Sequence, residues 1–575
     1  MSQQYKLFVE DRHYEKVKIC YSKSLKEIHI PSIDFISNKL FNQDLFEYDD
    51  NKIKIIHSSV RESENIPGVL VCNTQKTYGR KKDKFYYKCI PDDVRLPIFL
   101  IPYKIKLGFN KNISNKYIIF KFNNWNHKRP IGTMLNNFGD VNKLESFYEY
   151  QLYCKSLYAS IHYFQKKTIK ALRHKTEMDY VNIMIEKYKP IDRLKEEVIT
   201  IDGDNCKDFD DAMSFKETNE NIVISIYIAN VSYWLDILDL WDAFSMRIST
   251  IYLPDRKRPM LPTLLSDALC SLTENHIRFA FTLDLYIDKI NYDIIKTEYH
   301  NTIIDVKKNL RYDTEKMEKN KVYRKIRECV EILNKKKDMK YVNEINSSHD
   351  VIAYLMILMN YITAKKLLEK KSGLFRTAKS VKNFNPPKEI PKKVSKFLKI
   401  WNSEGGNYSK YSNSMDHEIL DLDAYVHITS PIRRLPDLLN MLIIQDQLNL
   451  FKFTKKSKTF YDKWLSDESI SYINKTMRSI RRVQNDCSLL NICSTDKSLL
   501  EKVYDGYIFD KLKRNDKLYQ YMVYLPELKM MNRFISKYEE KVISKQKFKI
   551  YIFIDENRLK QKIRVERQRE EVPLI

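Results

Sequence analysis

The densest group of reactive side chains is the segment IDGDNCKDFDDA, residues 201–212. Its ten positions 202–211 hold five aspartates and one lysine, whereas the whole chain has 75 acidic residues among 575. Strand-like apolar sequence lies on both sides, so these carboxylates repel each other unless a cation sits among them. Aspartate is a short oxygen ligand that suits Mg²⁺ or Mn²⁺. The segment therefore predicts a site for such a cation, and a solvated acidic turn is the alternative.

Two other metal sites do not fit the sequence. A calcium-hand loop needs an acidic or amide ligand at its fifth position and glycine at its sixth, where counting from Asp202 gives Cys206 and Lys207. A zinc site is not indicated, because no Cys/His cluster has ligand spacing. The nine cysteines are widely scattered and form no Cys-x-x-Cys. That pattern favours free thiols in a reducing, cytoplasmic compartment and leaves the nucleus open.

A second segment predicts an anion site. In YVHITSPIRRLPDLL, residues 425–439, Ser430-Pro431 precedes an apolar helical run, and Arg433 and Arg434 are expected in its first turn. Free N–H groups, a positive dipole end and two guanidinium groups would bind phosphate, although a solvated helix start is the alternative. The segment 252–272 has three prolines and too little periodicity for a regular helix. A metal site and an anion site together are the components for phosphodiester hydrolysis.

Composition points to a polyanionic partner. Lys and Arg number 100, which gives a net charge of +25. This favours nucleic acid or an anionic membrane surface, and a bias of the genome is the alternative. The longest apolar stretch, 351–359, is well short of the roughly 20 residues of a membrane span. The charged N-terminus has no apolar core, so the sequence predicts neither a span nor a signal peptide.

The rest of the chain supplies the elements that position these segments. Residues 1–190 contain short Ile-, Tyr- and Phe-rich strands at the spacing of small β-barrels, and a helix over 144–164 is expected to follow. The middle combines strands at 198–201 and 221–231 with helices, one of which begins at Ser347 or Ser348 and ends before Gly373. From about residue 499 short strands return, which predicts one more barrel and a basic tail over 556–571.

The acidic segment 201–212, the proline-containing segment 252–272 and the arginine segment 425–439 follow one another in this order. In their residues and their order they resemble the motifs of the RNB family of exoribonucleases, which includes ribonuclease II, ribonuclease R and the catalytic subunit of the eukaryotic exosome. The resemblance covers about 190–445 and continues weakly on both sides. It implies an α+β multidomain fold in which OB-type β-barrels flank a central mixed α/β RNB catalytic domain. The implied domains are two cold-shock or OB-like barrels over 1–95 and 96–190, the RNB domain over 191–495, and an OB-type RNA-binding barrel with the basic tail over 496–575.

The resemblance also implies an activity and its residues. The activity is hydrolysis of single-stranded RNA from its 3′ end to nucleoside 5′-monophosphates by a monomer, through a two-metal-ion mechanism with Mg²⁺ or Mn²⁺. The metal ligands would be Asp202, Asp208, Asp210 and Asp211. Asp210 would be the most critical of them for catalysis. Arg433 would act in catalysis and contact the phosphate beside Arg434, and Tyr252 would clamp the 3′-terminal nucleotides.

Two departures from the family pattern concern the substrate channel. Asn230 stands where the family usually has aspartate, and Met441-Leu442 stand where it often has His-Arg. Neither change affects the four aspartates. A catalytically silent RNA-binding scaffold or regulator and a DNA-directed metal nuclease are the competing hypotheses. The crowded carboxylates favour the enzyme, because a silent domain has no need of them.

Overall fold

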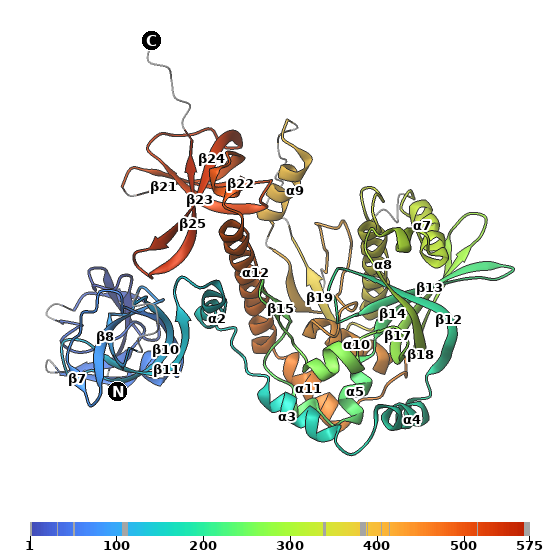
Figure 1. Cartoon of the computed structure of the whole chain (residues 1–575), viewed down its shortest axis with the longest axis horizontal. Coiled ribbons are helices and arrows are strands. Elements are labelled where there is room, and N and C mark those ends of the chain that lie inside the picture. Colours follow the sequence, from blue (N-terminus) through green and yellow to red (C-terminus); the bar gives the residue numbers. More distant parts are fainter. Residues whose placement is uncertain are drawn as a thin grey trace, which may run out of the picture. The chain divides into compact units, whose positions relative to one another are not determined.

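The computed structural model describes residues 3–30, 33–49, 52–105, 113–336, 341–379, 387, 389–403, 405–412, 415–514 and 516–568. The chain forms two compact units. The flanking unit comprises Met1–Tyr158, Leu253–Asp255 and Arg482–Ile575, and the central unit comprises Ala159–Tyr252 and Arg256–Arg481. Each unit is described by itself below (Figure 1).

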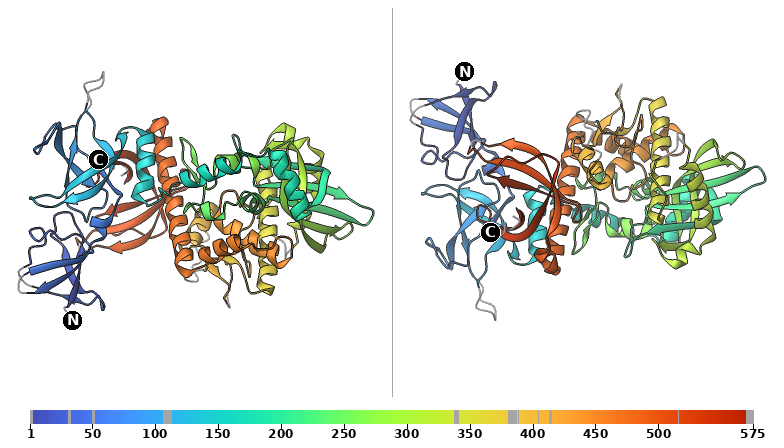
Figure 2. Two further views of the ribbon diagram at one scale, coloured as in Figure 1. Left: turned by 90° about the horizontal axis from the view of Figure 1, so that it is seen from below. Right: turned by 90° about the horizontal axis from the view of Figure 1, so that it is seen from above.

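The flanking unit begins with two β-modules that Figure 2 shows side by side in dark and light blue. The first is an open sheet in the order β3-β2-β1-β4-β5. The second has the order β6-β10-β11-β9-β8, and β6 also pairs with β8, so its strands form a closed ring that the short β7 extends. The strands are β1 (Gln4–Val9), β2 (Val17–Tyr21), β3 (Glu27–Ile28), β4 (Leu45–Asp49), β5 (Lys52–His57), β6 (Ile66–Leu70), β7 (Arg80–Lys81), β8 (Lys84–Pro91), β9 (Phe99–Tyr103), β10 (Lys116–Asn124) and β11 (Ile131–Asp140).

The third β-module of this unit has the order β23-β22-β21-β24-β25. If the main strands of each module are numbered 1 to 5 along the chain, all three modules share the neighbours 3-2-1-4-5, and the second adds a parallel 3–5 pair, β9 with β11. This is a five-stranded Greek-key arrangement of the OB kind. The prediction of β-barrel modules on both sides of a central domain is confirmed. The strands are β21 (Tyr504–Lys513), β22 (Tyr519–Leu525), β23 (Met530–Ser536), β24 (Ser544–Asp555) and β25 (Lys560–Arg567).

Three boundaries differ from the sequence-based expectations. A boundary at residue 95 is wrong, because β8 and β9 on either side of it pair in one sheet. The single helix expected over 144–164 is two helices, α2 (Leu144–Cys154) and α3 (His162–Ala171), because Ser156 adopts a left-handed φ of 56°. The basic tail begins as strand β25, whose Val565 is buried opposite Ile550. Residues 569–571 of the expected tail lie outside the described residues.

The central unit is built on a closed barrel in the order β12-β13-β14-β17-β18. Its strands are β12 (Ile191–Asp202), β13 (Asp211–Glu217), β14 (Asn221–Ala229), β17 (Ile277–Asp288) and β18 (Ile294–Arg311), and parallel pairing of β12 with β18 closes it. Alternate residues of β14 enter two different cores, as expected for a strand buried on both faces. The strands predicted at 198–201 and 221–231 are confirmed within β12 and β14.

Helices pack around this barrel. The expected helix start is confirmed: Ser347 caps α8 in a capping box with Asp350, and Gly373 follows with a φ of 102°. The longer helices are α4 (Glu177–Tyr188), α5 (Val231–Ile237), α7 (Lys321–Leu333), α8 (Ser348–Glu369), α9 (Lys392–Trp401), α10 (Leu435–Gln447), α11 (Lys455–Trp464) and α12 (Asp467–Thr495). Short elements of the central unit are η1 (Trp241–Ala243), β15 (Ile251–Tyr252), β16 (Lys257–Arg258), the π-helical turn η2 (Leu265–Leu269), α6 (Glu315–Glu318), β19 (Leu374–Thr377) and β20 (Asn407–Lys410). The short helices α1 (Ser59–Glu62) and α13 (Ser498–Glu501) belong to the flanking unit.

Within the described ranges one helix, α8, is long and apolar enough to cross a membrane by length and composition. More than half of its most apolar window is buried inside the protein, as in the core helix of a globular domain. Val351, Leu355 and Met359 lie in the same core as the isoleucines of β14. The apolar character of α8 is therefore accounted for by packing on the barrel.

Candidate active site

The acidic segment lies at one end of the barrel. Asp202 is the last residue of β12 and Asp211 is the first of β13. Between them the loop is fixed by its backbone, because the Asp210 carbonyl accepts from Ala229 N–H at 2.8 Å and Phe209 N–H donates to Ser271 Oγ at 3.0 Å. Two strand ends and a tethered loop therefore bring the carboxylates together.

These carboxylates are buried and poorly compensated. Asp210 is only 2% exposed. Burial raises the pKa of Asp210 to about 8, against the opposing effect of Arg433. Burial also raises the pKa of Asp202, and the charge of Asp210 adds to the effect; the pKa of Asp211 rises by burial and by the charge of Asp202. The buried Asp202 Oδ2 has no hydrogen-bond partner within the described part of the chain. The cluster is thus short of positive charge.

The arginine segment faces this cluster. Ile432 N–H donates to Asp210 Oδ1 at 2.8 Å, and Arg433 Nε lies 3.0 Å from Asp210 Oδ2. Arg433 Nη2 donates to Ser430 Oγ at 3.1 Å, yet its side chain remains 45% exposed. The guanidinium is therefore oriented by the protein and still open to a ligand.

The two arginines do not lie in the first turn of the helix, as the sequence had suggested. Helix α10 begins at Leu435, and Arg434 is its N-cap residue. The chain turns first at Ser430, whose carbonyl accepts from the N–H groups of both arginines, and Pro436 then occupies the start of the helix. Arg433 is held in this turn and approaches Asp210 from there.

Arg434 has a different environment from Arg433. Its Nη2 pairs with Oδ1 of the fully buried Asp437 at 2.8 Å. Asp437 also accepts the Ser430 N–H at 2.8 Å. Arg434 thus holds the turn that presents Arg433, and contact with RNA stays a prediction for it.

Asp208 contacts Tyr252 and also Lys257, a residue that the sequence did not indicate. Tyr252 Oη donates to Asp208 Oδ2 at 2.8 Å, and Lys257 Nζ donates to Asp208 Oδ1 at 2.8 Å. Lys257 also contacts Asp267 Oδ1 at 2.9 Å. Tyr252 remains 39% exposed, so its ring is available for stacking although its hydroxyl is engaged. Asp208 is the one predicted ligand whose two oxygens both accept hydrogen bonds from side chains.

A group of arginines was also missed in the sequence. Arg376 in β19 lies 4.8 Å from the centre of the Tyr408 ring. Burial lowers the pKa of Arg376, and the charges of Arg481, Arg434 and Arg478 lower it further. No carboxylate pairs with its guanidinium among the residues that the structure describes. Only the spacing of Arg478 and Arg481 on α12 could have signalled this group.

A divalent cation fits part of the acidic set. Asp202, Asp210 and Asp211 offer hard oxygen atoms and are short of positive charge, which suits Mg²⁺ or Mn²⁺. Over the described ranges, however, no group of three or more His, Cys, Asp or Glu side chains is arranged ready to hold a metal. These side chains would have to rearrange to close a ligand set.

The two family departures lie in the interior. Asn230 Nδ2 donates to Asn301 Oδ1 at 3.0 Å and to Gln445 Oε1 at 3.2 Å. Met441 and Leu442 are fully buried among apolar side chains. A neutral amide network therefore occupies the place of the expected acid.

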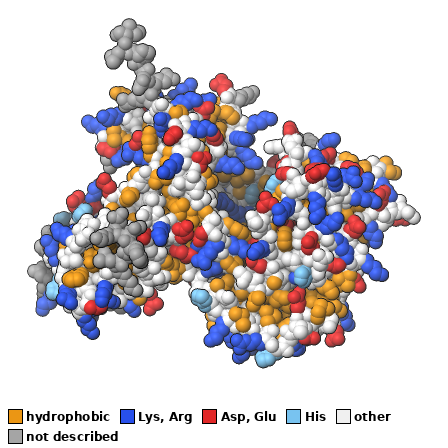
Figure 3. All heavy atoms as spheres, in the orientation of Figure 1, with side chains coloured by type: hydrophobic (Ala, Val, Ile, Leu, Met, Phe, Trp, Pro, Cys, Tyr) orange, Lys and Arg blue, Asp and Glu red, His pale blue; other side chains and the backbone are white. Residues whose placement is uncertain are grey.

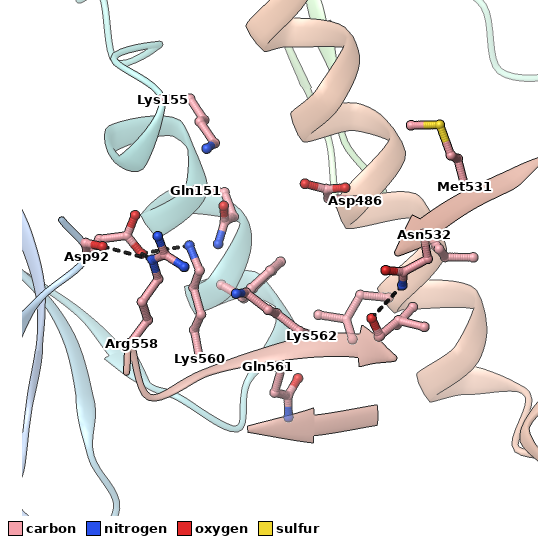
Figure 4. A pocket seen from close by; sticks show the side chains of 14 residues that line it. Asp92, Gln151, Lys155, Asp486, Met531, Asn532, Arg558, Lys560, Gln561 and Lys562 are labelled. Carbon is pink, nitrogen blue, oxygen red and sulfur yellow. Dashed lines mark hydrogen bonds and ion pairs between the residues drawn. The ribbon is translucent and has the colours of Figure 1, made fainter. Parts of the chain in front are cut away.

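The flanking unit has a cavity of about 350 Å³ between α2, α12 and the third β-module (Figure 4). Its main cations are already engaged: Lys560 Nζ bonds Asp92 Oδ1 at 2.7 Å, and Arg558 Nε donates to the Asp92 carbonyl at 2.9 Å. None of the predicted site residues lines it. On the face seen in Figure 3, Lys and Arg side chains are mixed with acidic ones in both units.

Comparisons with known proteins agree with this architecture. Residues 191–322 and 315–450 match the model of the RNB domain. Ribonuclease R of Mycoplasmopsis pulmonis is 32% identical over 361 residues, which cover 50% of this chain and 49% of the relative. Exosome complex exonuclease RRP44 of Mus musculus is 24% identical over 494 residues, covering 71% of this chain and 50% of the relative. The chain thus matches about half the length of these curated relatives.

Solved structures show the same fold. RNase R of Mycoplasma genitalium in complex with ribose-methylated single-stranded RNA has a TM-score of 0.67 at 15% identity, over 97% of this chain and 99% of that chain. Yeast Ssd1, a pseudonuclease, has a TM-score of 0.58 at 13% identity, over 92% and 78%. Residues 191–450 therefore match an RNB domain, and the likeness to the solved structures extends the agreement in fold to most of the chain.

Proposed function

We propose that this protein is a metal-dependent 3′-to-5′ exoribonuclease that hydrolyses single-stranded RNA to nucleoside 5′-monophosphates. The observation that carries the proposal is the pairing of Arg433 with Asp210. A buried cluster of carboxylates short of positive charge lies directly beside an arginine whose side chain keeps almost half of its surface exposed. Such a pair can place a phosphodiester between a cation site and a fixed donor.

The residues have distinct roles in this proposal. Arg433 donates to a non-bridging oxygen of the scissile phosphate and stabilises the negative charge that develops there. Asp210 orients Arg433 and, with Asp202 and Asp211, provides the carboxylate oxygens for a divalent ion. A bound Mg²⁺ supplies a Lewis acid and a water of lowered pKa. Tyr252 offers its exposed ring to a base at the 3′ end.

The direction and the substrate rest on the family resemblance and on the flanking modules. OB-type modules bind single strands by stacking and basic contacts that tolerate any sequence. We propose that the substrate strand is unpaired and enters the site with a free 3′ end. Preference for RNA over DNA would come from contacts to the 2′-hydroxyl. We further propose that the protein acts as a monomer in a reducing, cytoplasmic compartment.

The alternative is a catalytically silent RNA-binding protein. The similarity in fold to the pseudonuclease Ssd1 of yeast is the observation that favours this alternative. The silent alternative leaves the uncompensated charge of Asp202, Asp210 and Asp211 without a role, which is the reason to prefer the enzyme.

Degradation of RNA labelled at either end tests the proposal. The purified protein with Mg²⁺ should shorten 5′-labelled RNA progressively and release 5′-monophosphates from 3′-labelled RNA. EDTA should stop both reactions, and a circular RNA should survive. Binding of RNA without any cleavage, at several concentrations of Mg²⁺ and Mn²⁺, would establish the silent alternative. Internal fragments from a circular RNA would show an endonuclease instead.

A further inference from the structure

We propose that the ammonium group of Lys257 takes the place of a second divalent cation at Asp208, so that the site holds one divalent ion. The family resemblance led us to expect four aspartates as ligands of two ions. The structure divides those four carboxylates into two kinds. This inference rests on the proposed function for its biological meaning, but its test measures metal binding.

Both oxygens of Asp208 already accept hydrogen bonds from side chains, one of which is a cation. Asp208 is 8% exposed, and the two hydrogen bonds, from Lys257 Nζ and from Tyr252 Oη, are each 2.8 Å long. A divalent ion bonded to Asp208 would lie about 2.0–2.1 Å from one of these oxygens. The ion would then have to displace the ammonium or share the carboxylate with it at close range, and like charges repel at that distance.

The position of Lys257 is fixed by the backbone. Lys257 lies directly opposite Tyr252 in the β15–β16 pair, and side chains of such cross-strand partners project from the same face. Both side chains consequently reach Asp208. The hairpin follows residues 248–250, which are themselves bonded to the Arg433 turn: Thr250 N–H and Ser249 Oγ both donate to the Arg433 carbonyl at 2.9 Å.

A second carboxylate holds the ammonium from the other side. Lys257 Nζ lies 2.9 Å from Asp267 Oδ1, and Asp267 belongs to the π-helical turn η2, outside the acidic segment. Two carboxylates thus share one lysine whose side chain is 21% exposed. A lysine merely drawn toward an empty metal site would not need this second partner. The contact makes the cation a built part of the site.

The other three carboxylates show the opposite pattern. Asp202 Oδ2 is buried without a hydrogen-bond partner in the described structure, and Asp210 meets only one N–H donor and Arg433. Arg433 pairs with Asp210 in this group, but the place that is still short of positive charge lies beside Asp202, Asp210 and Asp211. The place beside Asp208 already has a cation.

Counting bound Mn²⁺ by electron paramagnetic resonance tests this division. The full chain is titrated with Mn²⁺ in the presence of a 2′-O-methylated RNA oligonucleotide, which supplies phosphate oxygens. We expect one tightly bound ion for the wild type and two for Lys257→Met, which keeps most of the length of the side chain and removes its charge. Lys289→Met is the matched control, since Lys289 pairs with Glu217 at 3.0 Å on the barrel, and it should bind one ion.

Asp267→Asn provides a milder variant in case Lys257→Met fails to fold. It loosens the ammonium without removing it, and we expect a second ion that binds at least about tenfold more weakly than the first. Two tight ions in the wild type, or one ion in every variant, would overturn the inference. The RNA degradation assay is read separately: a protein that binds one Mn²⁺ but cleaves no RNA contradicts the proposed function and leaves this inference standing.

Discussion

Two buried carboxylates, one in each unit, have very different hydrogen-bond and charge environments. Asp44 in the first β-module is fully buried, as Asp210 nearly is in the central unit. Asp44 accepts hydrogen bonds from Ser58 Oγ, from Arg61 Nη1 at 2.7 Å and from Phe41 N–H at 2.9 Å. Asp210 has one N–H donor and the ion pair with Arg433, and it lies among other carboxylates.

The difference lies in what surrounds the charge. Burial raises the pKa of Asp44, and every other nearby group opposes that rise. For Asp210, the charges of Asp208 and Asp211 act in the same direction as burial. A satisfied acid of the first kind joins parts of a module, here the 39–44 turn and helix α1. An acid of the second kind costs stability until a cation arrives, and that is the property expected of a site that binds one.

The largest contrast should come from removing each carboxylate. Asp210→Asn should lower the rate of RNA hydrolysis by about 10³-fold, because a carboxylate that positions charge at the reacting phosphate is lost. Its metal-free stability at neutral pH should stay the same or rise. Asp44→Ala should instead lower the free energy of unfolding by about 3–5 kcal/mol, since it leaves Arg61 without its buried partner.

Urea unfolding and single-turnover cleavage, measured on both variants, check this pair. RNA binding by Asp210→Asn should persist, because the basic contacts remain. If Asp210→Asn kept most of the wild-type rate, the placement of the site would be wrong.

The two adjacent arginines extend the same contrast. Arg433→Ala should lower the rate by about 10²–10³-fold, the scale for losing one fixed donor at developing charge. Arg433→Lys should restore little, because lysine lacks the planar fork. Arg434→Ala should mainly lower stability, since it leaves the buried Asp437 unpaired. Rate constants normalised to folded protein separate the two effects, and equal rate losses in both variants would contradict their assignment.

The dependence of stability on pH provides a further test of Asp210. The folded-state pKa of Asp210, about 8, lies above its unfolded value near 3.8, so the stability that it contributes is complete below pH 4 and is lost as pH rises toward 8. In EDTA, the unfolding midpoint of the wild type should therefore fall relative to Asp210→Asn over this range. The free energy of unfolding should change by at most about 1.4 kcal/mol per pH unit for each carboxylate.

Addition of Mg²⁺ should flatten that difference, because the ion binds the deprotonated carboxylates and stabilises the folded state. A wild-type midpoint that rose with pH relative to the variant would mean that Asp210 is well compensated without metal. Asp44 offers no comparable metal dependence.

The sequence predicted those features that lie close together along the chain. The five aspartates within 202–211 and the arginine segment could be recognised because each is a continuous motif. Lys257, by contrast, reaches Asp208 across 49 positions, and only the register of the β15–β16 hairpin brings them together. A domain boundary was wrongly expected at residue 95, inside the second β-module, for a similar reason, since pairing of β8 with β9 has no signal in local composition.

Arg376 carries the smallest expected effect and tests whether an unpaired cation, like an unpaired acid, marks a functional surface. It comes from β19, its neighbours Arg478 and Arg481 come from α12, and their charges lower its pKa, so packing alone does not favour their approach. A polyanion would relieve the repulsion, which makes the phosphate backbone of RNA the expected partner.

For a single strand, each phosphate contact contributes about −0.7 to the slope of log affinity against log salt. Arg376→Ala should reduce the magnitude of that slope by about this amount and weaken binding, with little change in the rate of cleavage at saturating RNA. Arg376→Lys should keep the slope, because the charge remains. Arg327→Ala is the matched control: Arg327 already pairs with Glu331 at 2.9 Å on α7, and its removal should leave the slope unchanged. Parallel salt plots for Arg376→Ala and the wild type would show that this cluster does not bind the backbone, and that repulsion among these arginines is tolerated for the sake of the fold alone.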